Sequence, residues 1–349
     1  MRILFLTGRE TSYARNDVLL RAFRRFAEVD VVGEHARGGI LRRSLTLPLQ
    51  AFARLRSLRY DLIFVGFFGQ ALMPAVSRRA RAPILFDAFV SAWDTLTGDR
   101  ARFGPRSLPG RLAFRLDQSA CNRAAHILLD TPLHVQFFAD TFRLPHAKIS
   151  AIPVGCNEDL FHPQPAETTR TVLYYTSYQP LHGAETVVRA AALAPEAQFK
   201  IIGDGQTAGA ARQLAGQLGI RNIQFAAPIP LDRLPGEIAS AAVCLGGHFG
   251  TSDKAGRVIP GKIYQIMAMA RPLIAGDTPA NRDLLGDEAA IFVKPADPAG
   301  LAASIQQILR DPEEGRRLAR GGRAVYKARA SEQVITSQLR RIVEGMLTP

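Results

Sequence analysis

Residues 250–277 read GTSDKAGRVIPGKIYQIMAMARPLIAGD, a pattern that predicts a polar loop, a short helix and a buried strand. Three cations, Lys254, Arg257 and Lys262, gather in the loop and in the first turn of the helix. The start of a helix adds unpaired N–H groups and a partial positive charge. An anion such as a diphosphate would be stabilised there. The alternative is a solvated basic loop at the edge of a sheet.

Short apolar runs alternate with helical spacing on both sides of this segment. The Pro-rich stretch at 161–165 separates the runs into two series. The alternation predicts an α/β fold with two tandem Rossmann-like, doubly wound domains and a cleft between them. The strands are expected at 3–7, 29–32, 62–65, 83–86, 127–129, 149–152, 172–175, 199–202, 223–225, 243–245, 273–275 and 290–293.

The expected domain boundaries follow from these two series. Residues 1–163 form the first domain and residues 164–330 the second, and two helices are expected after the last strand. The last helix, in residues 331–349, has apolar positions along one side only. That side has to pack on another surface, and the first domain is the expected one.

Composition limits the class of protein. A chain of 349 residues with 47% hydrophobic and 21% charged residues is typical of a two-domain globular protein. No apolar run approaches the roughly 20 residues of a membrane helix, and the start, MRILFLTGRE, is too polar for a signal peptide. These features predict a cytoplasmic protein. The three cysteines have no metal-ligand spacing and are expected to be buried and reduced.

The net charge of +13 is concentrated in arginines of the first domain. Such a surface attracts anionic lipid headgroups or nucleic acid. No nucleic-acid recognition motif accompanies it, so the expected partner is the anionic inner leaflet of a membrane, with peripheral docking. The arginines concerned are Arg21, Arg24, Arg25, Arg37, Arg42, Arg43, Arg54, Arg56, Arg59, Arg78, Arg79 and Arg81.

Three stretches carry a resemblance to a known family. They are AIPVGCNEDLFHP at 151–163, the pair KIIGDG at 200–205 and AAPIPLDRLPGEIASAAVCL at 226–245, and KIYQIMAMARPLIAGD at 262–277. These stretches resemble the GT-B glycosyltransferases that use nucleotide sugars, most closely the retaining family 4 type. Within that family, residues 254–265 and LFDAFVSAWDT at 85–95 resemble a branch of surface-polysaccharide biosynthesis. The resemblance implies that the first domain binds the acceptor and the second binds the nucleotide sugar.

The chain departs from the family pattern at two places. The paired glutamates of the family fall on Arg257 and Gln265, and an arginine and a lysine that bind diphosphate fall on Ser177 and His182. The resemblance therefore implies that the phosphate-neutralising charge has moved to Lys254, Arg257 and Lys262. The expected donor diphosphate site comprises Lys254, Arg257, Lys262, Ser177 and His182. The expected nucleoside site comprises Gly203, Asp204 and Gln265.

Candidates in the first domain follow its strands. Asp87 ends the strand at 83–86, where it could position or deprotonate an acceptor hydroxyl, although an Asp after a strand is often a turn former or helix cap. Gly8, Thr11 and Ser12 are expected in an acceptor or cleft loop, as are Ser91 and Asp94. For Gly8, Thr11 and Ser12, the alternative is an ordinary strand-to-helix connection.

The predicted function is that of a retaining hexosyltransferase, which moves a sugar from a nucleoside-diphosphate sugar to a glycan or polyprenyl-linked acceptor. No acidic D-x-D pair is visible, so the prediction is metal-independent transfer with no cofactor beyond the nucleotide sugar as substrate. Three alternatives remain: a nucleotide-sugar epimerase of the same fold, a non-catalytic transferase that has lost the glutamate pair, and a basic α/β protein that binds nucleic acid.

Overall fold

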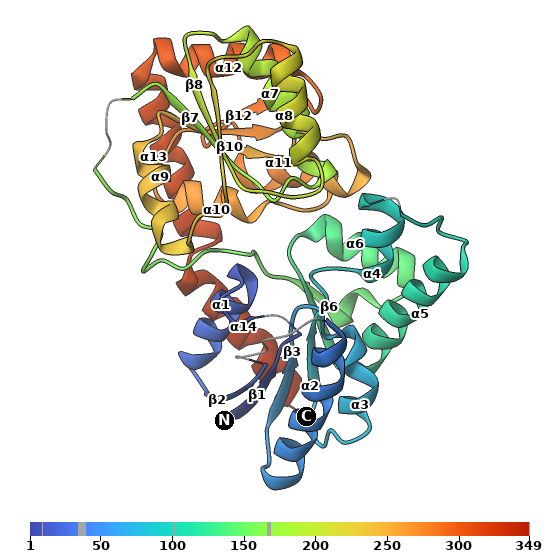
Figure 1. The fold of residues 1–349 in the computed structure, drawn as a ribbon. Helices are drawn as coiled ribbons and strands as arrows, with labels where there is room; N and C mark the ends of the chain where they lie inside the picture. Colours follow the sequence, from blue (N-terminus) through green and yellow to red (C-terminus); the bar gives the residue numbers. More distant parts are fainter. Residues whose placement is uncertain (9, 34–39, 101, 166–168, 349) are drawn as a thin grey trace. The chain divides into compact units, whose positions relative to one another are not determined.

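A computed structural model describes residues 1–8, 10–33, 40–100, 102–165 and 169–348. The chain divides into two compact units (Figure 1). The first unit comprises Met1–Gly155 and Glu332–Pro349, and the second comprises Cys156–Ser331. Each unit contains one six-stranded sheet in which all neighbouring strands are parallel, so the predicted doubly wound α/β fold class is confirmed. Arg37, one of the basic residues noted above, lies outside the described residues.

The sheet of the first unit has the strand order β2-β1-β3-β4-β5-β6. Alternate residues of a strand point to opposite faces, and each face is covered by its own helices. The strands are β1 (Arg2–Leu6), β2 (Glu28–Val32), β3 (Leu62–Val65), β4 (Ile84–Asp87), β5 (His126–Leu129) and β6 (Ile149–Ala151). The helices are α1 (Ala14–Arg24), α2 (Ile40–Ser57), α3 (Met73–Ser77), α4 (Ala92–Asp94), α5 (Leu108–Arg123), α6 (Pro132–Phe142) and α14 (Glu332–Leu347).

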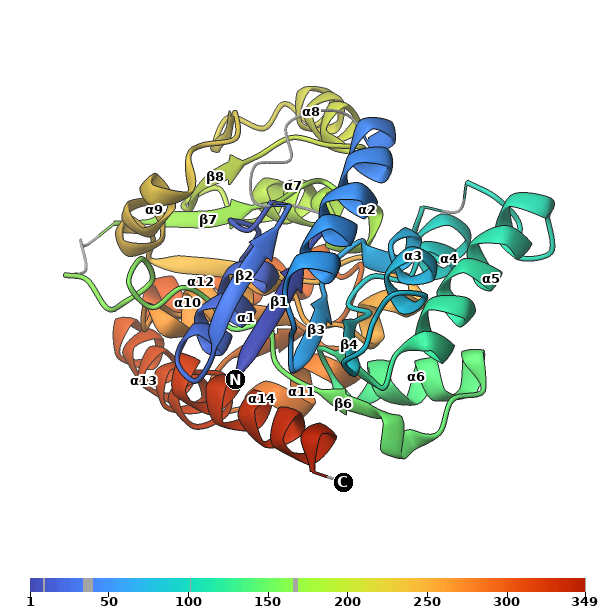
Figure 2. The same cartoon turned by 90° about the horizontal axis from the view of Figure 1, so that it is seen from below.

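The two faces of this sheet have separate apolar cores. Ile3 and Phe5 of β1 pack with α1 and α14, whereas Leu4 and Leu6 face α2, α3, α5 and α6. Figures 1 and 2 show α14, which comes from the end of the chain, beside α1 of the first unit. The apolar side of α14 is therefore buried against the first sheet.

The first residue of α14, Glu332, is tied to α1 by charge. Its carboxylate is almost fully buried and lies 2.7 Å from the Nε atom of Arg21 and 2.7 Å from an Nη atom of Arg25. A buried carboxylate that loses its partners is destabilising, and so is a cation pair left without its anion. Glu332 therefore fixes where the last helix begins.

Replacing Glu332 with alanine should lower the free energy of unfolding by about 1–3 kcal/mol, because two charge-assisted hydrogen bonds are lost. Urea unfolding followed by circular dichroism measures this. Glu344→Ala, which removes the exposed pair between Arg340 and Glu344 on the same helix, is the matched control and should cost about 0.5 kcal/mol or less. If the two substitutions lowered the free energy of unfolding equally, the stabilising role of Glu332 at the start of α14 would be contradicted.

The sheet of the second unit has the order β12-β11-β10-β7-β8-β9. Helices α7, α8 and α12 supply the apolar core on one face, and α10 packs against α13 and β10. The strands are β7 (Thr171–Tyr175), β8 (Gln198–Ile202), β9 (Ile223–Ala226), β10 (Val243–Gly247), β11 (Leu273–Gly276) and β12 (Ile291–Val293). The helices are α7 (Ala184–Leu193), α8 (Ala208–Gln217), α9 (Leu234–Ser240), α10 (Gly261–Ala268), α11 (Pro279–Leu285), α12 (Pro298–Arg310) and α13 (Pro312–Arg329).

The helices differ from the prediction in two respects. Three helices, α12, α13 and α14, follow the last strand instead of two, because Asp311 caps a separate helix that begins at Pro312. The sequence reading also missed α5, which Ser107 caps through the N–H group of Gly110. None of the helices within the described ranges combines the length and apolar character needed to span a bilayer.

Candidate functional site

The strand order of the second unit reverses between β7 and β10. The chain runs from β7 to β8 on one side, while β10 lies against the other side of β7. Parallel sheets of this kind bind ligands beyond the carboxyl ends of the strands at such a reversal. A ligand-binding site is therefore expected at the residues that follow β7 and β10.

Five side chains form what we call the switch-point cluster: Tyr174, Thr176, His182, His248 and Lys262. The imidazole rings of His182 and His248 are stacked, with centroids 5.7 Å apart and an interplanar angle of 6°. The Oγ1 atom of Thr176 lies 2.7 Å from Nδ1 of His182, and the hydroxyl of Tyr174 donates to the His182 carbonyl at 2.6 Å. These contacts hold the loop after β7 against the loop after β10.

Lys262, in the first turn of α10, supplies the charge of this cluster. Only 8% of the residue is exposed, and its Nζ atom has no hydrogen-bond or ion-pair partner among the residues that the structure describes. The ammonium instead lies over the ring of Tyr174, 4.4 Å from the centroid, which stabilises a cation only modestly. Burying an unpaired charge is costly, so the arrangement is suited to an anionic ligand that completes it.

Burial also changes the protonation of the cluster. It lowers the pKa of Lys262 to about 7. Desolvation, together with the nearby Lys262, lowers the pKa of His248 to about 3. The pKa of His182 lies well below its ordinary value for the same reasons, with a further contribution from His248. Both imidazoles are therefore neutral at pH 7, and Lys262 is the group that titrates near neutrality.

Gln265, one turn further along α10, is held beside the cluster. Its Oε1 atom accepts a hydrogen bond of 2.9 Å from the hydroxyl of Tyr175, which also reaches the carbonyl of Lys262 at 3.3 Å. The amide oxygen is thus already used within the protein. The amide nitrogen has no hydrogen-bond partner among the described residues and could donate to a ligand.

The two other cations of the predicted diphosphate site lie in the loop that precedes α10. Lys254 belongs to a short 3₁₀ helix, Asp253–Gly256, and Arg257 follows it, both half-buried. Lys254 lies close enough to His248 to lower its pKa. The structure therefore brings Lys262, His182 and Lys254 of the predicted set together.

The remaining predicted donor residues lie at the ends of β7 and β8. Ser177 is exposed and directly follows Thr176 of the cluster. Gly203 has a φ of +133°, and a Cβ there would lie 1.9 Å from the carbonyl oxygen of Thr176, so it is needed for close packing of the two loops. Asp204 is exposed, and its Oδ1 atom lies 3.9 Å from Nη2 of Arg212. The structure thus favours a structural role for Gly203 and leaves Asp204 accessible.

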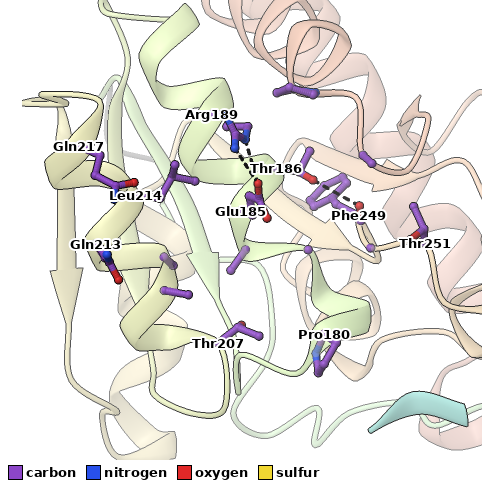
Figure 3. Close-up of a pocket in the computed structure, with 17 residues that line it drawn as sticks. Pro180, Glu185, Thr186, Arg189, Thr207, Gln213, Leu214, Gln217, Phe249 and Thr251 are labelled. Carbon is purple, nitrogen blue, oxygen red and sulfur yellow. Dashed lines mark hydrogen bonds and ion pairs between the residues drawn. The ribbon is translucent and has the colours of Figure 1, made fainter. Parts of the chain in front are cut away.

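A cavity of about 670 Å³ adjoins the loop after β10 (Figure 3). It lies between α8 and the first half of α7, where Glu185 pairs with Arg189 and the Thr186 hydroxyl donates to the carbonyl of Phe249. None of the predicted site residues lines it. It therefore lies beside the switch-point cluster rather than at it.

Asp87, the predicted catalytic residue of the first unit, is fully buried. Its carboxylate accepts hydrogen bonds from Nη2 of Arg15 at 2.9 Å and from Nε at 3.2 Å. Burial raises the pKa of the Asp87 carboxyl, and Arg15 beside it opposes that shift. The carboxylate is thus enclosed and paired within the first unit, and its role toward an acceptor hydroxyl stays a prediction.

The other predicted residues of the first unit divide into buried and accessible ones. The Ser91 hydroxyl donates to Asp117 and caps α4 through the N–H group of Asp94, and both Ser91 and Asp94 are buried. Gly8 is packed against the carbonyl of Phe68. Ser12 is exposed and Thr11 half-buried beyond the end of β1. Of this set, Ser12 is therefore accessible to a ligand, and Gly8 and Thr11 are partly so.

Sequence reasoning missed several residues that shape these sites. Tyr174 and Thr176 belong to an apolar strand and its end, and their pattern indicates only core packing. Arg15 resembles any arginine of an amphipathic helix, because its partners lie far away in the chain. Asp130 and His134 form another buried pair, with Oδ1 and Nδ1 2.6 Å apart. Within the described ranges, no group of three or more His, Cys, Asp or Glu is placed to hold a metal ion.

Comparison with known proteins agrees with this architecture. Residues 169–311 match the family model described as glycosyl transferases group 1. A search of curated proteins gives no match. Among solved structures, a sucrose-phosphate synthase from Thermosynechococcus elongatus is 18% identical, with a TM-score of 0.77 and 99% of each chain covered.

Two further solved structures share the fold. Anabaena HepE, determined in complex with UDP and glucose, is 16% identical, with a TM-score of 0.77 and 99% of each chain covered. TarM from S. aureus is 13% identical, with a TM-score of 0.66, and covers 84% of this chain and 58% of its own. The chain therefore shares the GT-B fold of these structures, and its residues 169–311 match the glycosyl transferases group 1.

Proposed function

We propose that this protein is a glycosyltransferase, and that it transfers a sugar, with retention of anomeric configuration, from a nucleoside-diphosphate sugar to a glycan or polyprenyl-linked acceptor. The second unit would bind the donor and the first unit the acceptor. The observation that carries the proposal is the buried ammonium of Lys262, which lies without an anionic partner among the described residues, at the strand-order reversal. The retaining outcome and the choice of acceptor rest on the family resemblance.

The chemistry required of the site is stabilisation of the leaving group. As the glycosidic bond to the donor phosphate breaks, negative charge develops on the departing nucleoside diphosphate. The Lys262 ammonium, the Ser177 hydroxyl and the N–H groups at the start of α7 are the donors we assign to it. Because these groups are fixed in the folded protein, they would stabilise the charge without a metal ion or other cofactor.

We propose a uridine nucleotide as the donor to test first, because HepE was solved with UDP and with UDP-glucose. Gln265 would donate its amide N–H to the ribose, since its oxygen is bonded to Tyr175. Asp204, exposed after β8, would accept from the nucleoside. The base and ribose would then lie beside the diphosphate, near the loops that follow β7, β8 and β10.

Calorimetric titration with UDP, GDP, ADP and UDP-glucose tests the proposal. We expect at least one nucleoside diphosphate to bind in a chelating buffer, and the matching sugar nucleotide to be turned over slowly to free sugar or transferred to added acceptors. Binding without any turnover would support the non-catalytic alternative. A protein that binds none of these compounds would refute the donor site.

A further inference from the structure

The start of α5 and the loop before it expose large apolar side chains. Leu108 is 72% exposed, Leu112 56% and Phe103 42%. Exposed apolar side chains that gather on one part of a surface mark candidate interaction sites. On α2, the side chains are described for residues 47–57, and Leu49 is 71% exposed there. Three such side chains gather on the one short segment at the start of α5.

The apolar side chains share their surface with arginines. Leu108, Arg111, Leu112 and Arg115 have the spacing i, i+3, i+4 and i+7, which places them on one face of the helix. Arg102 and Arg106 of the preceding loop are exposed as well. Within the described residues, none of these arginines forms an ion pair with a carboxylate. We call these seven residues the α5 patch: Phe103, Leu108 and Leu112 with Arg102, Arg106, Arg111 and Arg115.

The opposite face of α5 is anchored in the protein. Phe114 packs against Trp93 and Phe142, with ring centroids 5.7 Å and 5.1 Å away, and Asp117 is bonded by Ser91 and the N–H groups of Ala92 and Trp93. Figures 1 and 2 both show α4 and α5 at the outer edge of the first unit, and the end of α5, at Ala120 and Cys121, packs on the sheet. The helix therefore presents the α5 patch on a rigid support.

We propose that the α5 patch docks this protein on an anionic lipid bilayer. Phe103, Leu108 and Leu112 would enter the boundary between headgroups and acyl chains, and the arginines would bind lipid phosphates above them. A purely charged partner would not require the apolar side chains, and an apolar protein partner would not require unpaired arginines. Anionic lipid matches both, and the positive charge within about a Debye length of the surface strengthens the attraction.

The inference rests on the proposed function only for the reason to dock, namely a lipid-linked acceptor. It also places the docking surface on α5, whereas the sequence analysis singled out the arginines on and near α2. Around α2, Arg54 and Arg56 accompany a single exposed large apolar side chain among the described residues, Leu49, and Arg79 is stacked over Phe52 at 3.9 Å. The described side chains of α2, at residues 47–57, thus supply charge together with one exposed large apolar side chain.

Flotation with vesicles of phosphatidylcholine, with and without phosphatidylglycerol, tests the inference. The wild-type protein should float with the anionic vesicles and lose binding at high salt. The variant F103S/L108S/L112S should partition about tenfold or more weakly, because insertion loses its apolar area. The variant R111Q/R115Q should lose mainly the preference for anionic lipid. The matched control, L49S, removes an equally exposed leucine from α2 and should float like the wild type.

Weak flotation of L49S with normal flotation of the triple variant would overturn the inference in favour of α2. Absence of flotation by the wild-type protein would overturn it altogether. Calorimetry with UDP on the same preparations separates this failure from a failure of the proposed function. All of these surface variants should bind UDP as the wild type does, since none of the altered residues belongs to the donor-binding unit.

Discussion

Replacing Arg15 with methionine should destabilise the first unit by about 3–5 kcal/mol, the usual cost of leaving a buried charge without its partner. Arg15 is fully buried, and its guanidinium contacts Asp87 and three main-chain carbonyls. Those carbonyls belong to Leu129, Ile152 and Pro153, at 3.2, 2.6 and 3.0 Å. One side chain of α1 therefore joins the carboxyl ends of β4, β5 and β6.

Urea unfolding, followed by circular dichroism, measures the loss. Since the chain has two units, we expect the first unit of the variant to unfold in a separate, earlier transition. A second variant, R15M/D87L, removes both charges and should recover part of the stability, because no charge is then left unpaired. A loss below about 1 kcal/mol for Arg15→Met would show that the pair does not support the fold.

The same pair shows what the sequence could and could not predict. Strands such as β1 and β3 were recognisable because a strand buried on both faces is apolar throughout. The ion pair of Arg15 with Asp87 joins residues far apart in the chain, and neither residue carries a local signal of burial. Asp87 was predicted to be catalytic because it lies at the end of a strand. Structural carboxylates lie at the ends of strands as well.

The prediction of the candidate site was limited in a similar way. Lys254, Arg257 and Lys262 were visible because loop cations near a helix start are a local pattern. The sequence could not show that Lys262 is buried over Tyr174 or that two stacked histidines adjoin it. Helix α5 was missed because Pro109 and Gly110 weaken the helical signal and its leucines face outward. Its exposed face is the one that the docking inference uses.

Replacing Lys262 with methionine should weaken the binding of a nucleotide sugar about tenfold to hundredfold, the effect of one charge-assisted hydrogen bond. Methionine has similar length and no charge, so it removes the cation without opening a cavity. The pKa of Lys262 is lowered to about 7 by burial, which means that its charged form destabilises the folded protein. That penalty is full below about pH 7 and is relieved as the pH rises toward the ordinary lysine value.

Two further expectations follow from the lowered pKa of Lys262. The unliganded methionine variant should unfold at a temperature no lower than the wild type at pH 7, whereas a merely structural lysine would leave the variant less stable. A bound diphosphate should raise the pKa of Lys262, so the wild-type affinity should fall by up to about tenfold per pH unit above pH 7. The diester phosphates of UDP-glucose do not titrate in this range and leave Lys262 as the group responsible.

Calorimetry of UDP-glucose binding at pH 8, in buffers with different ionisation enthalpies, measures the protons taken up. The wild-type protein should take up close to one proton per ligand, and Lys262→Met should take up none and bind with little dependence on pH. Lys294→Met, a change at an exposed lysine after β12, is the matched control and should keep both the affinity and the proton uptake. Proton uptake that persists in Lys262→Met would place the titrating group elsewhere, and unchanged affinity would show that the diphosphate does not bind at the switch-point cluster.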